Sequence, residues 1–412
     1  MSVERGRNPL PALLSVLLAL ALTVPALLAP SPASSGRSPR FPSRIAGYSW
    51  WVAGQSTSPV DAAVLLYQNG VGVEFLDTPQ SVLLSRDGTS YRRFDDAEGR
   101  SIAADQGDPA PTLLSPDGTF ALVAGADGHG AVEVVTLRDG ARRSVPVGDG
   151  MSAVPVGLSA DGRSALLLTS PTTLSRLQDL FFRLHGTLTR LDLSTGDLMP
   201  YPHLADVNAA ALSPDGTTML VDTAGGLVLA RSADGQVVAR LDVPGDPVSL
   251  DGDAWSPDGA LIALTRGPQL LLVDPSHPGV IRAFPLPGFG DARAIGWRDA
   301  HSALVHAQSA SDDNDSTFLW VDTLTGAREP FSRYVPGPTG AALGPADAAR
   351  DLVPLWQVAE QPVDRGPLLS WPLALLVVLI AGTLAWRLTP RRRAATPVFG
   401  QPDVTASAPR GR

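Results

Sequence analysis

The phrase Leu-Ser-Pro-Asp-Gly recurs along the chain, and this repeat is the strongest constraint on the fold. It stands at 114–118 and 212–216, with the variants LSADG at 158–162 and WSPDG at 255–259. Pro fixes φ at about −65° in the second turn position, Asp hydrogen-bonds nearby backbone, and Gly accepts a left-handed conformation. A short apolar stretch follows each copy. The phrase therefore predicts a tight turn between two antiparallel strands.

A second type of hairpin alternates with the first. Its members include VEVVTLRDGARRSV from Val132 and FLWVDTLTGAREPF from Phe318. Each of the six members has a glycine at its turn: Gly88, Gly140, Gly196, Gly235, Gly279 and Gly326. A degraded copy of the first phrase begins at Gly296, and its Trp297 follows Trp255 by 42 residues. Two alternating hairpins make a four-stranded unit with a period of about 43 residues, which indicates an all-β fold, a β-propeller.

The LSPDG phrase followed by an apolar strand resembles the repeat of TolB-like, WD-type bacterial propellers. The resemblance covers roughly residues 45–360. It implies the propeller architecture and carries no functional residue over to this chain. The aromatic-rich continuation that is typical after the second strand is weak here.

Six blades are expected, and seven are an alternative. Six result if the far end of the domain, AALGPADAARDLVPLW from Ala341, completes the blade whose second hairpin has its turn at Gly88. Closing one blade with strands from both ends of the domain removes open sheet edges. Seven result if SPVDAAVLLYQNGVGVEF from Ser58 supplies that hairpin and the far end adds another blade.

Two apolar segments flank the repeats. Leu10 to Ala29 has no charged residue, and it is either a cleaved signal peptide or a transmembrane anchor. Leu368 to Trp386 is also free of charges, with Trp371 and Trp386 near its ends, and an arginine-rich stretch follows it. This pattern predicts a transmembrane helix with interfacial tryptophan anchors.

The positive-inside rule places both arginine-bearing ends in the cytoplasm and the repeats outside it. The predicted location is the cell membrane of a bacterium, with the bulk of the chain extracytoplasmic. The expected organisation is a cytoplasmic start (1–9), a signal peptide or anchor (10–29), a Pro/Ser-rich linker (30–44), the propeller (45–360), a second linker (361–367), a transmembrane helix (368–386) and a basic, disordered cytoplasmic tail (387–412).

Composition excludes several kinds of chemistry. The chain has no cysteine, so thiolate nucleophiles and zinc–thiolate sites are impossible. The net charge of −9 becomes −15 for residues 8–386, which argues against nucleic-acid binding. No hydrolase elbow, phosphate-binding loop or zinc-protease motif occurs. The sequence assigns no catalytic, cofactor-binding or metal-binding residue, because its histidines are scattered: His129, His185, His203, His277, His301 and His306. His301 and His306 are expected on opposite faces of one strand.

Three segments depart from the repeat. Ser170 to Gly186 is an insertion with Leu174, Leu177, Phe181 and Leu184 at helical spacing, and we expect it to cap a blade or cover a face of the ring rather than dock a partner or the membrane. The acidic loop at 309–317 places Asp312, Asn314 and Ser316 at alternate positions but lacks the glycine and distal carboxylate of a calcium loop, so a solvated hairpin tip is expected. The aromatic-rich segments 44–55 and 66–80 are expected to pack structurally, with a binding surface as the alternative.

These observations favour a binding or scaffolding module that is tethered to the membrane and non-enzymatic, with a protein or envelope ligand as partner. The alternative is an enzyme that acts on a small ester, lactone or glycan in the central channel. Propeller enzymes gather catalytic carboxylates from several blades and so leave no local motif. A bound metal, or several carboxylates that converge at one mouth of the ring, would favour this alternative.

Overall fold

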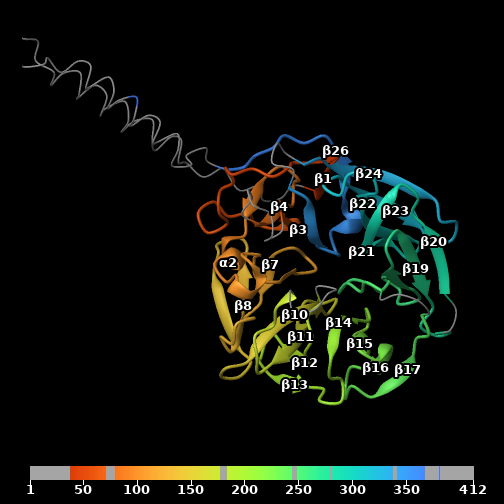
Figure 1. The fold of residues 1–412 in the computed structure, drawn as a ribbon. Coiled ribbons are helices and arrows are strands. Elements are labelled where there is room, and N and C mark those ends of the chain that lie inside the picture. Colours follow the sequence, from red (N-terminus) through yellow and green to blue (C-terminus); the bar gives the residue numbers. More distant parts are fainter. Residues whose placement is uncertain are drawn as a thin grey trace, which may run out of the picture. The chain divides into compact units, whose positions relative to one another are not determined.

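The computed structural model describes residues 38–70, 79–176, 183–243, 248–278, 281–336, 341–366 and residue 380. Its strands form six sheets around a common axis, and each sheet is one blade of a propeller (Figure 1). The prediction of an all-β, six-bladed propeller is thereby confirmed. A further two-stranded sheet joins segments near the two ends of the described chain.

The blades are numbered here along the chain. Blade 1 contains β25 (Leu343–Ala348), β3 (Ala63–Asn69), β4 (Gln80–Ser85) and β5 (Tyr91–Arg93). Blade 2 contains β6 (Thr112–Leu114), β7 (Phe120–Val123), β8 (Ala131–Thr136) and β9 (Arg142–Pro146). Blade 3 contains β10 (Ser152–Leu158), β11 (Ser164–Ser170), β12 (Thr187–Asp192) and β13 (Leu198–Pro200). Blade 4 contains β14 (Val207–Leu212), β15 (Thr218–Thr223), β16 (Gly226–Arg231) and β17 (Val237–Arg240).

The last two blades are less regular. Blade 5 contains β18 (Ile262–Thr265), β19 (Gln269–Val273) and β20 (Ile281–Pro285), and its inner segment, 248–255, joins β18 through two isolated bridges. Blade 6 contains β21 (Phe289–Asp299), β22 (Ser302–Ser309), β23 (Ser316–Asp322), β24 (Arg328–Tyr334) and the short β2 (Arg44–Ile45). Three short helices, α2 (Asp95–Glu98), η1 (Ala103–Asp105) and η3 (Val353–Leu355), lie in connections.

Blade 1 closes the ring. Its inner strand β25 comes from the far end of the domain and pairs antiparallel with β3, with Ala346 opposite Tyr67. The far end thus supplies a single strand instead of the hairpin that we expected. The stretch from Ser58, which we considered only for a seven-bladed ring, supplies the adjacent strand of the same blade. Both segments contribute to one sheet, and the count remains six.

The repeated phrase forms the turn between the first two strands of a blade through a fixed set of hydrogen bonds. At the first copy, the Ser115 hydroxyl donates to Oδ1 of Asp117 at 2.8 Å, and that oxygen also accepts the backbone N–H of Thr119 at 3.0 Å. Gly118 has a φ of 71°, in the left-handed region. The same serine–aspartate bond occurs at the three other copies, between Ser159 and Asp161, Ser213 and Asp215, and Ser256 and Asp258.

Two tryptophans of the repeat join neighbouring blades. The Trp255 indole N–H donates to the carbonyl oxygen of Ala211 in blade 4, and that of Trp297 donates to Ala254 in blade 5, both at 3.2 Å. Both side chains are buried in the hydrophobic cores between blades. The 42-residue spacing of the two tryptophans therefore reflects one blade-to-blade contact made twice.

The ends of the described chain cover sheet edges. β1 (Arg40–Pro42) pairs in parallel with β26 (Gln357–Ala359), and β2 pairs in parallel with β24 of blade 6. The outer strand of blade 1 has bridges from Ser90 to Asp364 and from Arg93 to Gly54. Ordered strand pairing thus extends into the segments 30–44 and 361–367, which we expected to be linkers.

Among the described residues, no helix is both long and apolar enough to cross a membrane. The segment Leu10–Ala29 lies outside the described residues, and so does Leu368–Trp386 apart from residue 380. The predicted signal or anchor segment, the transmembrane helix and the basic tail remain predictions.

Candidate functional site

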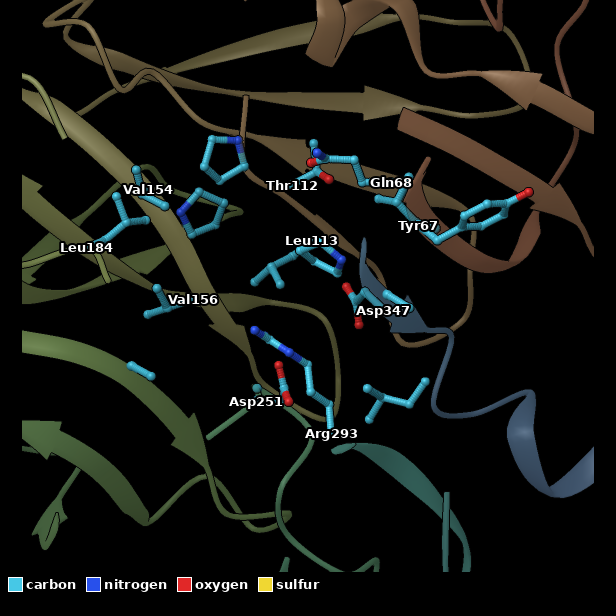
Figure 2. A pocket seen from close by; sticks show the side chains of 18 of the residues that line it. Tyr67, Gln68, Thr112, Leu113, Val154, Val156, Leu184, Asp251, Arg293 and Asp347 are labelled. Atoms are coloured by element: carbon cyan, nitrogen blue, oxygen red, sulfur yellow. The ribbon is translucent and has the colours of Figure 1, made fainter. Parts of the chain in front are cut away.

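A cavity of about 250 Å³ lies on the axis of the ring (Figure 2). The inner strand or inner segment of each of the six blades contributes to its lining, because alternate residues of these strands face the axis. The polar lining residues are Tyr67, Gln68, Ser81, Thr112, Arg176, Asn208, Asp251, Asp253, Arg293 and Asp347. Proline, leucine, valine and isoleucine side chains form much of the remaining wall.

Three carboxylates reach this cavity from two blades: Asp251 and Asp253 from the inner segment of blade 5, and Asp347 from β25 of blade 1. Asp253 forms an ion pair with Arg350, with 2.9 Å between Oδ1 and Nη2, and Arg350 also donates to the carbonyl oxygen of Leu158 at 2.8 Å. Asp347 accepts the backbone N–H of Leu114 at 2.6 Å. Two of the three carboxylates therefore have anchoring partners from other blades.

Asp251 differs from the other two carboxylates. Its Oδ2 atom is buried and has no hydrogen-bond partner among the described residues. Arg293, on β21 of the adjacent blade 6, also lines the cavity, and its side chain lies near that of Asp251 in Figure 2. A buried, unpaired carboxylate oxygen is costly unless a ligand or water supplies a donor, so this atom is a candidate contact for a ligand or an ordered water.

Burial raises the pKa of all three carboxyls. For Asp347 the pKa is raised well above the usual 3.8, first by burial and then by repulsion from Asp253, while the Leu114 N–H opposes the rise. For Asp253 burial raises the pKa against the attraction of Arg350, and for Asp251 it does so against Arg293. The axis thus holds a proton more tightly than three surface carboxyls would.

The Asp253–Arg350 ion pair lies between two cavities. Gly252 and Asp253 line the axial cavity and also a second one of about 460 Å³, which Arg350, Trp255 and Trp297 line as well. Prolines of two repeat turns, Pro214 and Pro257, belong to this second cavity, so it opens on the face of the ring that carries the LSPDG turns. The ion pair therefore divides the channel.

The two described ends of the insertion, 170–176 and 183–186, lie near the axial cavity. Arg176 forms an ion pair with Asp108 at 3.0 Å, and Asp108 also accepts a hydrogen bond from Gln68 at 2.8 Å. At the other end of the insertion, Arg183 lies 3.6 Å from Asp222. Arg176 and Leu184 both line the cavity. The two described ends of this segment thus lie at the axial cavity, and its role as a cover of the ring remains a prediction.

The helical spacing proposed for the insertion is only partly visible. Leu174 is buried, its backbone N–H donates to the carbonyl oxygen of Ala126 at 2.9 Å, and residues 171–175 are not helical. Leu184 packs against the main hydrophobic core. Leu177 and Phe181 lie outside the described residues.

The histidines lie apart, as expected. His301 is exposed in the turn between β21 and β22, whereas His306 lies within β22, is buried and stacks on Phe318 with ring centroids 5.0 Å apart. Burial, together with Arg293, lowers the pKa of His306 to about 3, so this side chain is neutral at physiological pH. Across the described part of the chain, no group of three His, Cys, Asp or Glu residues could hold a metal ion.

The other two departures from the repeat have clear roles. The acidic loop joins β22 to β23, and Asp312 accepts the backbone N–H of Asn314 at 3.0 Å, as in an ordinary turn at a hairpin tip. In the aromatic segments, Tyr48 and Tyr67 are buried, which confirms structural packing for them. Trp50 and Trp51 are exposed, which structural packing does not explain.

The sequence did not identify the channel residues, because no local motif marks them. Asp251 and Asp253 belong to VSLDGDAW, immediately before a repeat phrase, and Asp347 belongs to GPADAAR, in the most degraded copy. Carboxylates from two blades thus converge on the axial cavity.

No protein-family model matches the chain, and no curated protein matches it. Among solved structures, an Agrobacterium tumefaciens protein assigned as a TolB is 16% identical, with 58% of this chain and 89% of that chain covered and a TM-score of 0.41. An oligogalacturonate lyase in complex with manganese is 14% identical, with 65% and 78% covered and a TM-score of 0.44. A chain of a mitotic checkpoint complex is 16% identical, with 53% and 64% covered and a TM-score of 0.38.

The chain therefore spans less than two thirds of the checkpoint-complex chain. A TolB is among the similar structures, in keeping with the resemblance of the repeat. At this low identity the assignment of a six-bladed propeller rests on the strand pairing itself, and the functions of these proteins are their own.

Proposed function

We propose that the protein is a membrane-tethered, extracytoplasmic binding module that takes a ligand or a side chain of a partner protein into its axial cavity. The observation that carries the proposal is Oδ2 of Asp251, a buried acceptor without a partner among the described residues, in a cavity built by all six blades. A rigid ring with convergent polar groups on its axis is a typical ligand site.

The lining indicates the chemistry of the ligand. A volume of about 250 Å³ is slightly below that of most ligand pockets, so it suits one small group and not a polymer. Arg176 is already paired with Asp108, and Asp253 with Arg350, so the unpartnered Oδ2 of Asp251 is the acceptor that a hydrogen-bond donor or a positive charge of the ligand would complete. We infer a primary amine, a guanidinium or an amino sugar.

The test uses the full-length protein in detergent and a panel of small amines, guanidinium compounds and amino sugars. At least one member should raise the melting temperature of the wild type, because a ligand that binds only the folded state stabilises it. Asp251→Asn should abolish that shift, and Asp313→Asn, at an exposed hairpin position, should retain it. An equal shift in Asp251→Asn and the wild type would contradict the assignment.

The membrane tether rests on the two apolar segments and on the arginines beside them. The absence of native cysteine allows a direct test, because a single introduced cysteine is the only thiol. In intact cells, an impermeant maleimide should label Leu324→Cys on the ring and leave Ser407→Cys in the tail unlabelled. The reverse pattern would overturn the topology, and recovery of the full chain in the soluble fraction would overturn the tether.

One observation favours the enzymatic alternative as a second candidate. The raised pKa of Asp347 keeps a proton available in the same cavity as Asp251, an arrangement suited to general acid and general base. Turnover of an ester, lactone or glycan by the purified protein, lost in Asp347→Asn, would support this candidate. A ligand that binds at Asp251 and is released unchanged would support the binding module.

A further inference from the structure

Two adjacent tryptophans, Trp50 and Trp51, are exposed on the ring. Their exposed fractions are 53% and 48%, whereas those of Trp255, Trp297 and Trp320 are between 4% and 8%. Tryptophan is the largest side chain, and its exposure leaves much apolar surface in water. Nothing within the described part of the ring covers this pair. We call it the Trp50–Trp51 surface.

The surface is held in place by its neighbours. Tyr48 is buried and its ring meets that of Trp50 edge-on, with centroids 5.9 Å apart. The backbone carbonyl of Ser49 accepts a hydrogen bond from Gln80 at 3.1 Å, and the backbone N–H of Trp51 donates to the Ser49 hydroxyl at 3.2 Å. The tryptophans are therefore presented by an anchored segment.

The chain leaves the ring beside this surface. The backbone N–H of Ala53 donates to the carbonyl oxygen of Arg365 at 2.8 Å, and the Arg365 guanidinium donates to the carbonyl oxygen of Gly47 at 3.2 Å. Gly366 lies so close to Ala53 that a Cβ on Gly366 would be 2.4 Å from the Ala53 Cβ. Val363, just before this contact, is 46% exposed.

Little slack separates the ring from the apolar segment. Asp364 is tied to the outer strand of blade 1, because its carboxylate pairs with Arg92 at 3.0 Å and its backbone bonds to Thr89 and Tyr91. Gly366 donates its N–H to the Asp364 carboxylate at 2.8 Å. Only two residue steps then lead from Gly366 to Leu368, a reach of at most about 7 Å.

We propose that the Trp50–Trp51 surface rests in the headgroup region of the membrane that anchors the chain. This inference depends on the membrane tether of the proposed function. The short reach from Gly366 identifies the occupant, since a span that begins at Leu368 brings the bilayer surface next to the tryptophans. Tryptophan is the residue that favours this interface. The contact fixes how the ring is oriented on the membrane.

The orientation can be stated in terms of the two faces of the ring. Gln80, which holds the Trp50–Trp51 surface, begins β4 at the end of the blade that lies away from the LSPDG turns. Leu324 lies in the turn between β23 and β24, and the neighbouring Thr323 bonds to His301 in the turn between β21 and β22, at the LSPDG-turn end. The LSPDG-turn face, with its cavity of about 460 Å³, therefore points away from the bilayer.

The test uses the absence of native cysteine. Trp51→Cys and Leu324→Cys each carry an environment-sensitive fluorophore, and the full chain is reconstituted into phosphatidylcholine–phosphatidylglycerol vesicles that contain nitroxide-labelled lipid. The label at Trp51→Cys should lose roughly half of its emission, because interfacial side chains lie within about 5–10 Å of the acyl boundary. Leu324 is 60% exposed and on the other face, so its label should keep its emission.

Each outcome decides the matter. If the protein floats with the vesicles but neither label is quenched by nitroxide lipid, the proposed membrane contact of the Trp50–Trp51 surface is refuted and the tether is not. If the protein does not float with the vesicles, the tether fails and the surface with it. Equal quenching at both positions indicates adsorption without orientation and overturns the proposal. In native membranes, protection of the label from aqueous iodide without lipid quenching indicates a protein partner and also overturns it.

A second variant guards against loss of folding. The double change Trp50→Ala and Trp51→Ala removes exposed side chains and should leave the melting temperature nearly unchanged. A label at Ser49→Cys, next to the pair, should be quenched by nitroxide lipid in the otherwise unaltered chain and lose that quenching in the double variant. Quenching that persists would show that the tryptophans do not seat the ring on the membrane.

Discussion

Aspartates in two regions of the ring are in opposite environments. In the repeat turns, hydrogen bonds lower the pKa, first from the serine hydroxyl two residues earlier and then from backbone N–H groups, at Asp161 and Asp215. On the axis, burial raises the pKa at Asp251, Asp253 and Asp347. The turn aspartates are satisfied by residues within five positions of sequence, whereas the partners of the axial aspartates lie in other blades.

The difference in environment distinguishes the aspartates that stabilise the fold from those that are candidates for binding a ligand. A carboxylate whose bonds are all local stabilises its own turn and can be repeated in every blade. A carboxylate that must be desolvated to reach the axis opposes folding unless distant groups compensate, and such a group is retained where a ligand needs it. The following variants test this separation, from the largest expected effect on stability to the smallest.

Loss of Arg350 should be the most damaging change. Arg350→Met keeps most of the side-chain volume but leaves Asp253 buried without its cation, and breaking a buried ion pair costs about 3–5 kcal/mol. Chemical denaturation of the full chain in detergent measures the loss. Arg231→Met is the matched control, because the Arg231–Asp234 pair is about half exposed and should be worth less than about 1 kcal/mol. Similar losses in both variants would erase the distinction between axis and surface.

Replacing the turn glycine by alanine should cost more stability at Gly118, whose turn packs against blade 1, than at Gly216. Gly118 and Gly216 have φ values of 71° and 70°, so alanine at either position costs roughly 1–2 kcal/mol of backbone strain. A Cβ at Gly118 would also lie 2.0 Å from the carbonyl oxygen of Ala63 in blade 1, whereas a Cβ at Gly216 meets nothing within 4 Å. Thermal denaturation should therefore show a clearly larger loss for Gly118→Ala. Equal losses of stability would mean that blade 1 moves away from the added methyl group without a measurable loss of stability.

The axial pKa shift predicts an inverse dependence on pH. The folded state keeps a proton on Asp347 that the unfolded chain, with a usual pKa of 3.8, releases. The stability from this proton is fully present below the unfolded-state pKa and is lost as the pH rises through the raised folded-state pKa. Asp347→Asn should thus be more stable than the wild type near neutral pH, and the two should converge at acidic pH. Denaturation at a series of pH values tests this, and a less stable variant at neutral pH would refute it.

The separation also explains what the sequence could predict. The repeat turns were predictable because Ser, Pro, Asp and Gly act within five residues, and the structure repeats the bond from Ser115 to Asp117 at each copy. The blade count followed from their spacing. The site was not predictable, because Asp347 and Asp251 come from the most degraded copy and from an inner segment with only isolated bridges. Which residues face the axis depends on strand register, which a shift of one residue reverses.

The exposed tryptophans were noticed in the sequence only as part of an aromatic segment. Aromatic content did not distinguish the buried Tyr48 from the exposed Trp50 and Trp51, two and three residues away. The segment is placed by contacts such as that of Ala53 with Arg365, which join the two ends of the domain. Long-range contacts of this kind give the ring both its axial site and its proposed membrane surface.

The smallest effect is expected at a turn aspartate, with the opposite pH dependence. Asp215→Asn keeps the shape of the side chain but removes the charge that strengthens the bonds from the Ser213 hydroxyl and the Thr217 N–H, at 2.6 and 3.0 Å. Because Asp215 is exposed, we expect a loss of about 0.5–1 kcal/mol at neutral pH.

The lowered pKa of Asp215 means that this stability is present above the usual value of 3.8 and is lost as the pH falls through the folded-state pKa. At neutral pH the wild type should therefore be more stable than Asp215→Asn, and the two should converge in acid. Asp347→Asn, in contrast, should be more stable than the wild type at neutral pH and should also converge with it in acid. Curves of the same sign for the two variants would show that the axis and the turns do not hold aspartate in opposite ways.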